Sequence, residues 1–234
     1  MAVAGADGLT PGFAITHTVA TGSTEEGAVM QTPSVQRLMA ILTKPKEIWP
    51  QIAGETTSIR ALYMGWILWL AAIPAVFSSI GAALMWSRMM GPATMLGMGG
   101  VGPFVIQNLV MGYILQIALV AVLAWATMAL AKSFDGQPDL AQATKTVAYA
   151  FTPVWLAGVF QALPVPFLGA LVSLAAWVYA IYQLFLGLPL TMRCPAQKAG
   201  AYTAVIAVIG VVVAILLGMI MGGMWLASRA GTPF

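Results

Sequence analysis

Residues 104–131 read FVIQNLVMGYILQIALVAVLAWATMALA, and this stretch decides the fold. It contains no acidic or basic side chain, follows Pro103 and ends at Lys132. A helix needs about 20 apolar residues to cross the hydrocarbon core of a bilayer. Proline suits the first turn of a helix, where its missing N–H is not needed. The stretch therefore predicts a membrane-spanning α-helix that begins just after Pro103.

Four further apolar runs share this character, because none of them contains an acidic or basic residue. They cover residues 61–86, 147–163, 167–190 and 203–227. The run at 147–163 is the shortest and carries Pro153. The junction with the next run, Leu163-Pro164-Val165-Pro166, is short and uncharged, so these two runs must form a tight hairpin. The sequence predicts an all-α, polytopic membrane bundle with five transmembrane helices.

The overall composition points the same way. Only 7% of the residues are charged and 60% are apolar, whereas a soluble domain is about 25% charged. The basic residues form no stripe interleaved with aromatic residues, so nucleic acid is not an expected partner. One histidine, His17, and one cysteine, Cys194, are too few for a zinc site, and a single cysteine forms no intrachain disulfide.

The chain before the first run divides into two parts. Residues 1–33 are rich in Gly, Ala, Thr and Ser and predict a disordered tail, and Met30 is an alternative start. Residues 34–60 predict an amphipathic segment, in which Ser34 caps a helix with its apolar residues at helical spacing. This segment lies at the membrane interface or packs under the bundle, and both can hold. Residues 61–234 form the transmembrane domain.

Basic residues are unevenly distributed between the two predicted sides of the membrane. Eight of the ten Lys and Arg residues fall on the side of the N-terminal segment, while Arg88 and Arg229 fall on the other. Cytoplasmic segments carry an excess of Lys and Arg. The distribution therefore predicts a cytoplasmic N-terminus and a C-terminus outside.

Small residues recur every fourth position in the last run, at Gly210, Ala214, Gly218 and Gly222. Helices in lipid associate by close packing, which small residues permit. This ladder predicts a helix–helix contact. The partner is another helix of this chain, which we favour, or a second copy.

Two motifs in the loop after the first run have a chemical and a structural interpretation. Residues 97–102 match a G-x-G-x-x-G pattern, but no strand precedes them, so a turned loop is the better interpretation. Thioethers select Cu(I), so the methionines of this region suggest a copper site, although no His or Cys reinforces them. The alternative is gap filling in an apolar loop. These methionines are Met85, Met89, Met90, Met95 and Met98.

Catalytic and ion-relay groups are scarce. Asp135 and Asp139 suit turn and helix-dipole roles, and neither a P-loop nor an H-E-x-x-H motif occurs. Ion pathways usually contain charged residues inside the spans, whereas the polar residues here are neutral. These neutral residues are Gln107, Asn108, Gln116, Thr152, Gln161 and Gln183. We predict no enzyme activity, no cofactor and no metal, and a passive channel or a lipid-handling protein stays open.

Several short motifs together resemble one known family. They are Leu42–Trp49 (LTKPKEIW), Lys132–Gly136 (KSFDG), Thr146–Pro153 (TVAYAFTP), Leu163-Pro164, Tyr179–Tyr182 (YAIY), Leu186–Pro189 (LGLP), and Lys198, Ala199 and Tyr202. In their order and five-span layout, residues from about 35 to 227 resemble the bacterial branch of the Yip family, the Rab-GTPase-interacting membrane proteins. The family-motif positions singled out are Tyr149, Pro153, Pro164, Tyr182 and Gly187.

The resemblance implies a multi-pass protein of a bacterial inner membrane with a cytoplasmic N-terminus. Eukaryotic members assemble with relatives and with small GTPases in vesicle traffic. We therefore expect a non-enzymatic scaffold or assembly protein that contacts membrane lipids and either a membrane-protein partner or itself. The alternative is a small passive channel or a lipid or solute translocator. The candidate docking residues on the cytoplasmic face are Pro45, Trp49, Phe134, Gly136, Arg193 and Lys198.

Overall fold

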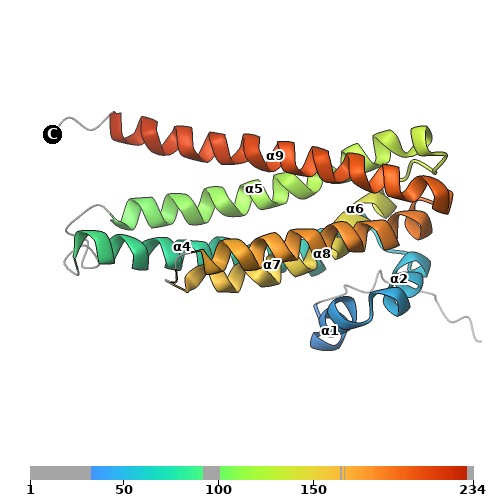
Figure 1. Cartoon of the computed structure of the whole chain (residues 1–234), viewed down its shortest axis with the longest axis horizontal. Coiled ribbons are helices and arrows are strands. Elements are labelled where there is room, and N and C mark those ends of the chain that lie inside the picture. Colours follow the sequence, from blue (N-terminus) through green and yellow to red (C-terminus); the bar gives the residue numbers. More distant parts are fainter. Residues whose placement is uncertain (1–32, 92–100, 164, 166, 231–234) are drawn as a thin grey trace, which may run out of the picture.

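The computed structural model describes residues 33–91, 101–163, 165 and 167–230, and the regular elements in those residues are all helical. Long helices run along one direction, and the N-terminal helices α1 and α2 lie at one end of them (Figure 1). The elements are α1 (Val35–Thr43), α2 (Pro45–Gly54), α3 (Ile59–Leu62), the π-helical turn η1 (Tyr63–Ile67), α4 (Leu68–Met90), α5 (Val101–Leu130), η3 (Ala131–Phe134), α6 (Leu140–Ala150), α7 (Thr152–Ala157), η4 (Gly158–Ala162), α8 (Leu168–Thr191) and α9 (Ala196–Ala230).

Four stretches among the described residues are long and apolar enough to cross a membrane. They are Ile59–Arg88, Gly102–Phe134, Leu168–Thr191 and Ala196–Ile220. These match four of the five predicted runs, and the all-helical, multi-spanning fold is confirmed. The predicted tail at 1–33 lies, except for Pro33, outside the described residues.

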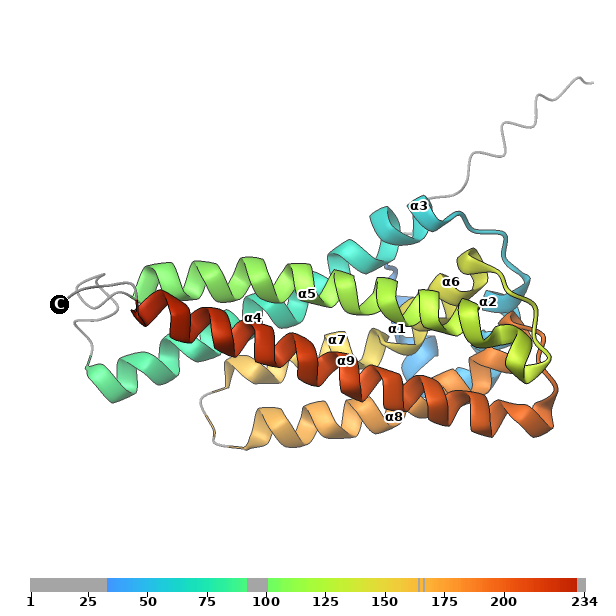
Figure 2. The same cartoon turned by 90° about the horizontal axis from the view of Figure 1, so that it is seen from above.

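The remaining predicted run, at 147–163, is not one continuous helix. It runs through the end of α6, then α7 and η4, and Figure 2 shows this path along the bundle beside α8. Pro153 explains the break, because proline has no N–H to donate and its ring collides with the preceding turn of a helix. A new helix starts at once, since the N–H groups of Val154 and Trp155 donate to the carbonyl of Phe151 at 3.0 and 3.1 Å.

The broken segment approaches α4 unusually closely. A Cβ atom built on Gly158 would lie 2.6 Å from Cα of Pro74, and one built on Gly81 would collide with the carbonyl of Gln161. Small residues, and glycine most of all, allow two helices to touch through their backbones. The two glycines therefore fix α4 against η4.

Gly158→Ala is expected to destabilise the protein, because the added methyl group has no room beside Pro74. The matched control is Gly112→Ala in α5, where the nearest atom would lie 3.9 Å away. Alanine is a better helix former than glycine by roughly 0.5–1 kcal/mol, so the control should be neutral or stabilising. Thermal unfolding in detergent measures both variants, and an unchanged midpoint for Gly158→Ala would contradict the close packing.

The small-residue ladder of α9 divides into two parts. A Cβ on Gly210 would lie 3.5 Å from Trp177 and 3.6 Å from Leu123, so this position packs within the chain. Ala214 and Gly218 instead line a cavity. A Cβ on Gly218 or on Gly222 would meet nothing within 4 Å. The far half of the ladder therefore makes no close helix contact among the described residues: Ala214 and Gly218 border the cavity, and Gly222 faces open space.

The N-terminal helices pack under the bundle. Ile41 of α1 is buried, as are Ile48, Trp49 and Ile52 of α2. Val35 and Met39 of α1 stay exposed, at 75% and 55%. One face of the segment 34–60 therefore packs under the bundle, as one of the two interpretations expected, and the other face stays available to lipid.

Candidate functional site

One end of the bundle collects most of the charged groups, and we call it the charged end. It consists of α1 to α3, α6, the start of α9 and the loops at 131–139 and 192–195 (Figures 1 and 2). Arg88, near the last residue of α4, belongs to the opposite end. The basic residues of the charged end are Arg37, Lys44, Lys46, Arg60, Lys132, Lys145, Arg193 and Lys198.

Polar side chains of α8 hold the N-terminal helices in place. The indole N–H of Trp49 donates to Oε1 of Gln183 at 2.6 Å. Nε2 of Gln183 donates to the carbonyl of Ile41 at 2.6 Å, and the hydroxyl of Tyr179 donates to the carbonyl of Leu42 at 2.8 Å. The last carbonyls of a helix lack partners within the helix. Two side chains of α8 thus provide partners at the end of α1.

Trp49 is only 1% exposed, and Gly187 of α8 makes room for it. A Cβ atom on Gly187 would lie 2.6 Å from Cη2 of the indole. The inclusion of Trp49 among the docking residues is therefore corrected, because its side chain faces the bundle and offers a partner no surface. The amphipathic pattern identified an apolar face but not what that face covers.

A buried lysine, missed as a structural residue by sequence reasoning, fixes α2 to α6. Lys145 is 1% exposed, and its Nζ donates to the carbonyls of Ile52 and Glu55 at 2.9 and 2.6 Å. The pKa of Lys145 is lowered from its ordinary value, because the effect of burial outweighs the opposite effect of the Glu55 carboxylate. A cation at a helix C-terminus is favourable, because the unpaired carbonyls there carry partial negative charge.

Arg37 completes this cluster. Its guanidinium donates two hydrogen bonds to the carboxylate of Glu55, at 2.9 and 2.7 Å. It also lies 4.8 Å from the ring centre of Tyr149, which is itself 4.8 Å from the ring of Trp66. The charges of Arg37, Glu55 and Lys145 are thus all engaged in holding helices together. In the sequence, the signal for this structural role was the position of Lys145, two residues before the apolar run at 147–163.

Four of the predicted docking residues do come together. We call residues 132–139 and 192–198 the loop pair. Phe134 stacks on Tyr202, with ring centres 4.6 Å apart, and Lys198 forms an ion pair with Asp135. Nη1 of Arg193 donates to Oε1 of Gln137 at 3.3 Å. A Cβ on Gly136 would lie 3.0 Å from the carbonyl of Met192, so the two loops touch through their backbones.

The loop pair also holds two non-glycine residues in the left-handed region. Asp135 has φ of 56° and Arg193 has φ of 52°. This conformation is uncommon for side-chain-bearing residues, and such conformations cluster at functional sites. Pro45, by contrast, begins α2 and lies outside the loop pair.

Most of the family-motif positions that the structure describes are buried. Tyr149, Pro153 and Gly187 are buried, while Tyr182 is exposed with its ring centre 5.8 Å from that of Tyr179. Pro164 lies outside the described residues.

Cys194 is expected to react slowly with a maleimide in the folded protein. The side chain is 5% exposed, and burial raises the pKa of the thiol, so the reactive thiolate is scarce. Ser133→Cys in a Cys194→Ser background provides the control, because Ser133 is exposed in the same loop pair. Mass spectrometry during labelling should show fast modification of the control alone; equal rates would contradict the buried position.

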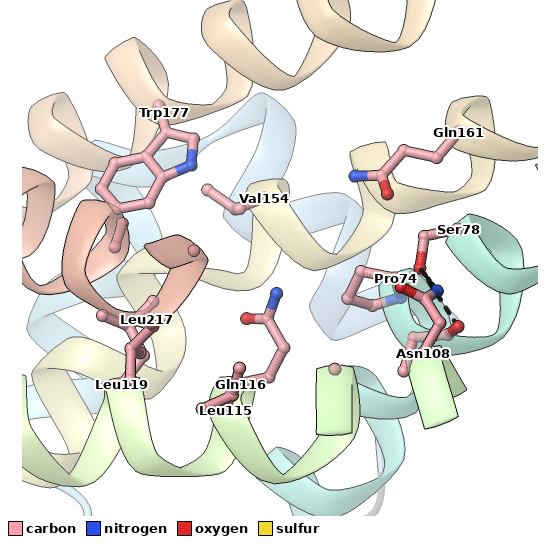
Figure 3. Close-up of a pocket in the computed structure, with 14 residues that line it drawn as sticks. Pro74, Ser78, Asn108, Leu115, Gln116, Leu119, Val154, Gln161, Trp177 and Leu217 are labelled. Carbon is pink, nitrogen blue, oxygen red and sulfur yellow. Dashed lines mark hydrogen bonds between the residues drawn. The ribbon is translucent and has the colours of Figure 1, made fainter. Parts of the chain in front are cut away.

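A cavity of about 300 Å³ lies away from the charged end, between helices α4, α5, α8 and α9 and the α7–η4 segment. We call it the crevice, and Figure 3 shows its lining. Its polar side chains are Ser78, Asn108, Gln116 and Gln161. Nδ2 of Asn108 donates to Ser79 at 3.0 Å and to Ser78 at 3.3 Å. The neutral polar residues noted in the runs are thus partly gathered at one place.

The crevice and the charged end are separated by a fully buried part of the core. Trp66 and Tyr149 are fully buried there, as are Leu123 and Tyr202. The hydroxyl of Tyr202 donates to the carbonyl of Thr127, and the indole of Trp66 donates to Thr152 at 3.1 Å. Side chains therefore fill the bundle between the two regions.

The suggested metal and nucleotide motifs lie largely outside the part of the chain that the structure describes. It contains no cluster of three or more His, Cys, Asp or Glu residues able to hold a metal ion. Most of the G-x-G-x-x-G pattern, as well as Met95 and Met98 of the suggested copper site, lies outside the described residues, and the side chains of Met89 and Met90 are not described.

Comparison with known proteins identifies the family. The profile of the Yip1 domain matches residues 39–219. The chain is 26% identical over 180 residues to the inner membrane protein YohC of Escherichia coli strain K12, covering 76% of this chain and 90% of that protein. YohC of Escherichia coli O6:H1 gives the same values. No solved structure matches the chain. The resemblance seen in the short motifs is confirmed, and the chain belongs to the Yip1 domain family of membrane proteins.

Proposed function

We propose that this protein is a non-enzymatic scaffold or assembly factor of a bacterial inner membrane, which binds another membrane protein through its loop pair. The observation that carries the proposal is the construction of the loop pair. Two left-handed residues, Asp135 and Arg193, are held in place by an ion pair, backbone contacts and a stacked ring pair. A preorganised surface loses little entropy when it binds a partner.

The exposed chemistry of the loop pair suits a protein partner. Arg193 and Lys132 are exposed, and Phe134 is half-buried beside them. Arginine and aromatic residues are enriched among the side chains that dominate interface energetics. The positive-inside rule orients the charged end toward the cytoplasm, with the C-terminus outside. The partner would therefore present its complementary surface on the cytoplasmic side.

The non-enzymatic part of the proposal rests on how the buried titratable groups are used. Arg37, Glu55 and Lys145 form the principal cluster of such groups among the described residues, and each bonds to the fold itself. A catalytic acid or base must reach a substrate proton within hydrogen-bonding distance. A cluster whose charged groups bond to helix ends and to one another is suited to structure. Nucleic acid is not a proposed partner.

Purification from the native membrane in mild detergent, followed by native mass spectrometry, tests the scaffold role. The wild-type protein should retain one reproducible second protein. The double variant Lys132→Glu, Arg193→Asn should lose it, and asparagine tolerates the left-handed conformation of residue 193. Arg88→Gln at the opposite end is the control and should retain the partner. A lone chain, or a partner retained by the double variant, would contradict the proposed docking surface.

A second candidate function, a lipid or solute translocator, is favoured by the crevice with its four neutral polar side chains. Polar residues inside a membrane commonly mark a substrate pathway. The packed core around Trp66 and Tyr149 would have to open for passage. Flux measurements in liposomes carrying the purified protein test this role, and no flux of ions, sugars or labelled lipids would contradict it.

A further inference from the structure

We propose that the crevice is a binding site for an uncharged glycerolipid, with diacylglycerol as its simplest ligand. The lipid's hydroxyl-bearing glycerol end would bond to the polar side chains, and its acyl chains would leave along α9 into the bilayer. This inference does not depend on the scaffold role, because the crevice and the loop pair lie at different levels of the bundle.

Unpaired amide groups are the first observation. The side-chain amides of Gln116 and Gln161 are partly buried and make no hydrogen bond to another described residue, and Figure 3 shows both directed toward the interior of the crevice. Gln116 lies near the middle of the apolar stretch Gly102–Phe134. A polar group left unpaired in hydrocarbon costs several kcal/mol. These amides therefore call for a partner that enters the crevice.

The second observation defines the chemistry of that partner. An amide both donates and accepts, which matches a hydroxyl group, and the Nδ2 of Asn108 is already bonded to Ser78 and Ser79. None of the described residues that line the crevice is charged. A buried phosphate would therefore lack a countercharge, which is strongly unfavourable in a low dielectric. The lining selects an uncharged head over the phosphate of an ordinary phospholipid.

The third observation is a route for the acyl chains. The crevice opens beside α9, because Gly218 both lines it and is exposed at the surface of the bundle. Leu216 and Met219, on either side of Gly218 in α9, are exposed. The apolar walls include Leu115, Leu119 and Trp177. A volume of about 300 Å³ is at the lower limit for a small-molecule site, so it suits a glycerol head and the first part of a chain.

Gln161 lies between the crevice and the end of the bundle that is opposite to the charged end. It also borders a second cavity of about 390 Å³, whose lining includes Leu163 and Phe167 at the turn between η4 and α8. A lipid head that starts at this membrane surface would thus meet Gln161 first and Gln116 deeper in the bilayer. The two amides mark a polar path for a head group that crosses an apolar region.

Photo-crosslinking with a diazirine-bearing diacylglycerol in nanodiscs tests the proposal. The wild-type protein should be labelled saturably, and unlabelled diacylglycerol should compete at least about tenfold better than phosphatidylglycerol or phosphatidylethanolamine with the same chains. Gln116→Leu should lower labelling about tenfold, which corresponds to roughly 1.4 kcal/mol. Gln107→Leu, on the same helix but outside the crevice, should leave labelling unchanged.

Gly218→Leu provides an independent variant, because the open space around Gly218 accepts a side chain without a clash. It should block labelling while the thermal midpoint stays at the wild-type value. Equal competition by the three lipids would overturn the selectivity for an uncharged head. Labelling that both crevice variants retain, or no labelling of the wild-type protein, would show that water or bulk lipid fills the crevice.

Discussion

Trp49→Ala should destabilise the protein by about 3–5 kcal/mol, the range found when a large buried aromatic side chain is removed from a core. The indole fills the space left by Gly187 and bonds to Gln183. Its loss creates a cavity and leaves the amide oxygen of Gln183 without its donor. Since Gln183 also bonds to Ile41, we expect α1 and α2 to detach from α8.

Trp69→Ala is the matched control for this prediction. Trp69 is 67% exposed, and its indole donates only to the carbonyl of Met64 in the same span. Truncating it should cost far less, because it leaves no cavity in the core. Thermal unfolding and limited proteolysis of residues 34–60 in detergent report both effects. Equal losses for the two variants would contradict the placement of Trp49.

Lys145→Met should cost about 2–4 kcal/mol, because two charge-assisted hydrogen bonds to buried carbonyls are lost together. Methionine keeps the length and apolar stem of lysine but offers no donor to Ile52 and Glu55. Lys132→Met, at an exposed position of the same end, should change stability by a few tenths of a kcal/mol. If Lys145→Met leaves the free energy of unfolding unchanged, the ammonium group contributes no net stabilisation.

The pH dependence of this variant has a defined sign. Because the pKa of Lys145 is lowered from 10.5 in the folded state, the unfolded chain binds more protons between the two pKa values. Stability rises with pH wherever the unfolded state binds more protons. The wild-type protein should therefore gain stability relative to Lys145→Met as the pH increases toward 10.5. Denaturant unfolding at several alkaline pH values checks the trend.

The sequence predicted the spans well because lipid imposes a simple rule. A run such as 104–131 without a charge can satisfy its backbone in hydrocarbon only as a helix, and α5 does so. Pro153 was visible as a helix breaker, but its consequence was not. The break brings Gly158 against Pro74, and a pairing of positions so far apart in the chain has no local signal.

The sites were less predictable because they depend on which faces meet. Trp49 and Arg193 carry equally suggestive side chains, yet only Arg193 is exposed. Gln116 and Gln183 are both neutral amides in apolar runs. Gln183 finds partners in α1 and α2, whereas Gln116 faces the crevice. Composition identifies such residues, and the packing of helices then decides whether each one stabilises the bundle or binds a ligand.

Site-specific photo-crosslinking in the native membrane tests the scaffold role most directly. A photoreactive phenylalanine derivative replaces Lys132 in the loop pair or, as a control, Phe167, which is 82% exposed at the opposite end. We predict a single protein adduct from position 132 and none from position 167. Adducts from position 167 alone, or from neither position, would contradict a docking surface at the charged end.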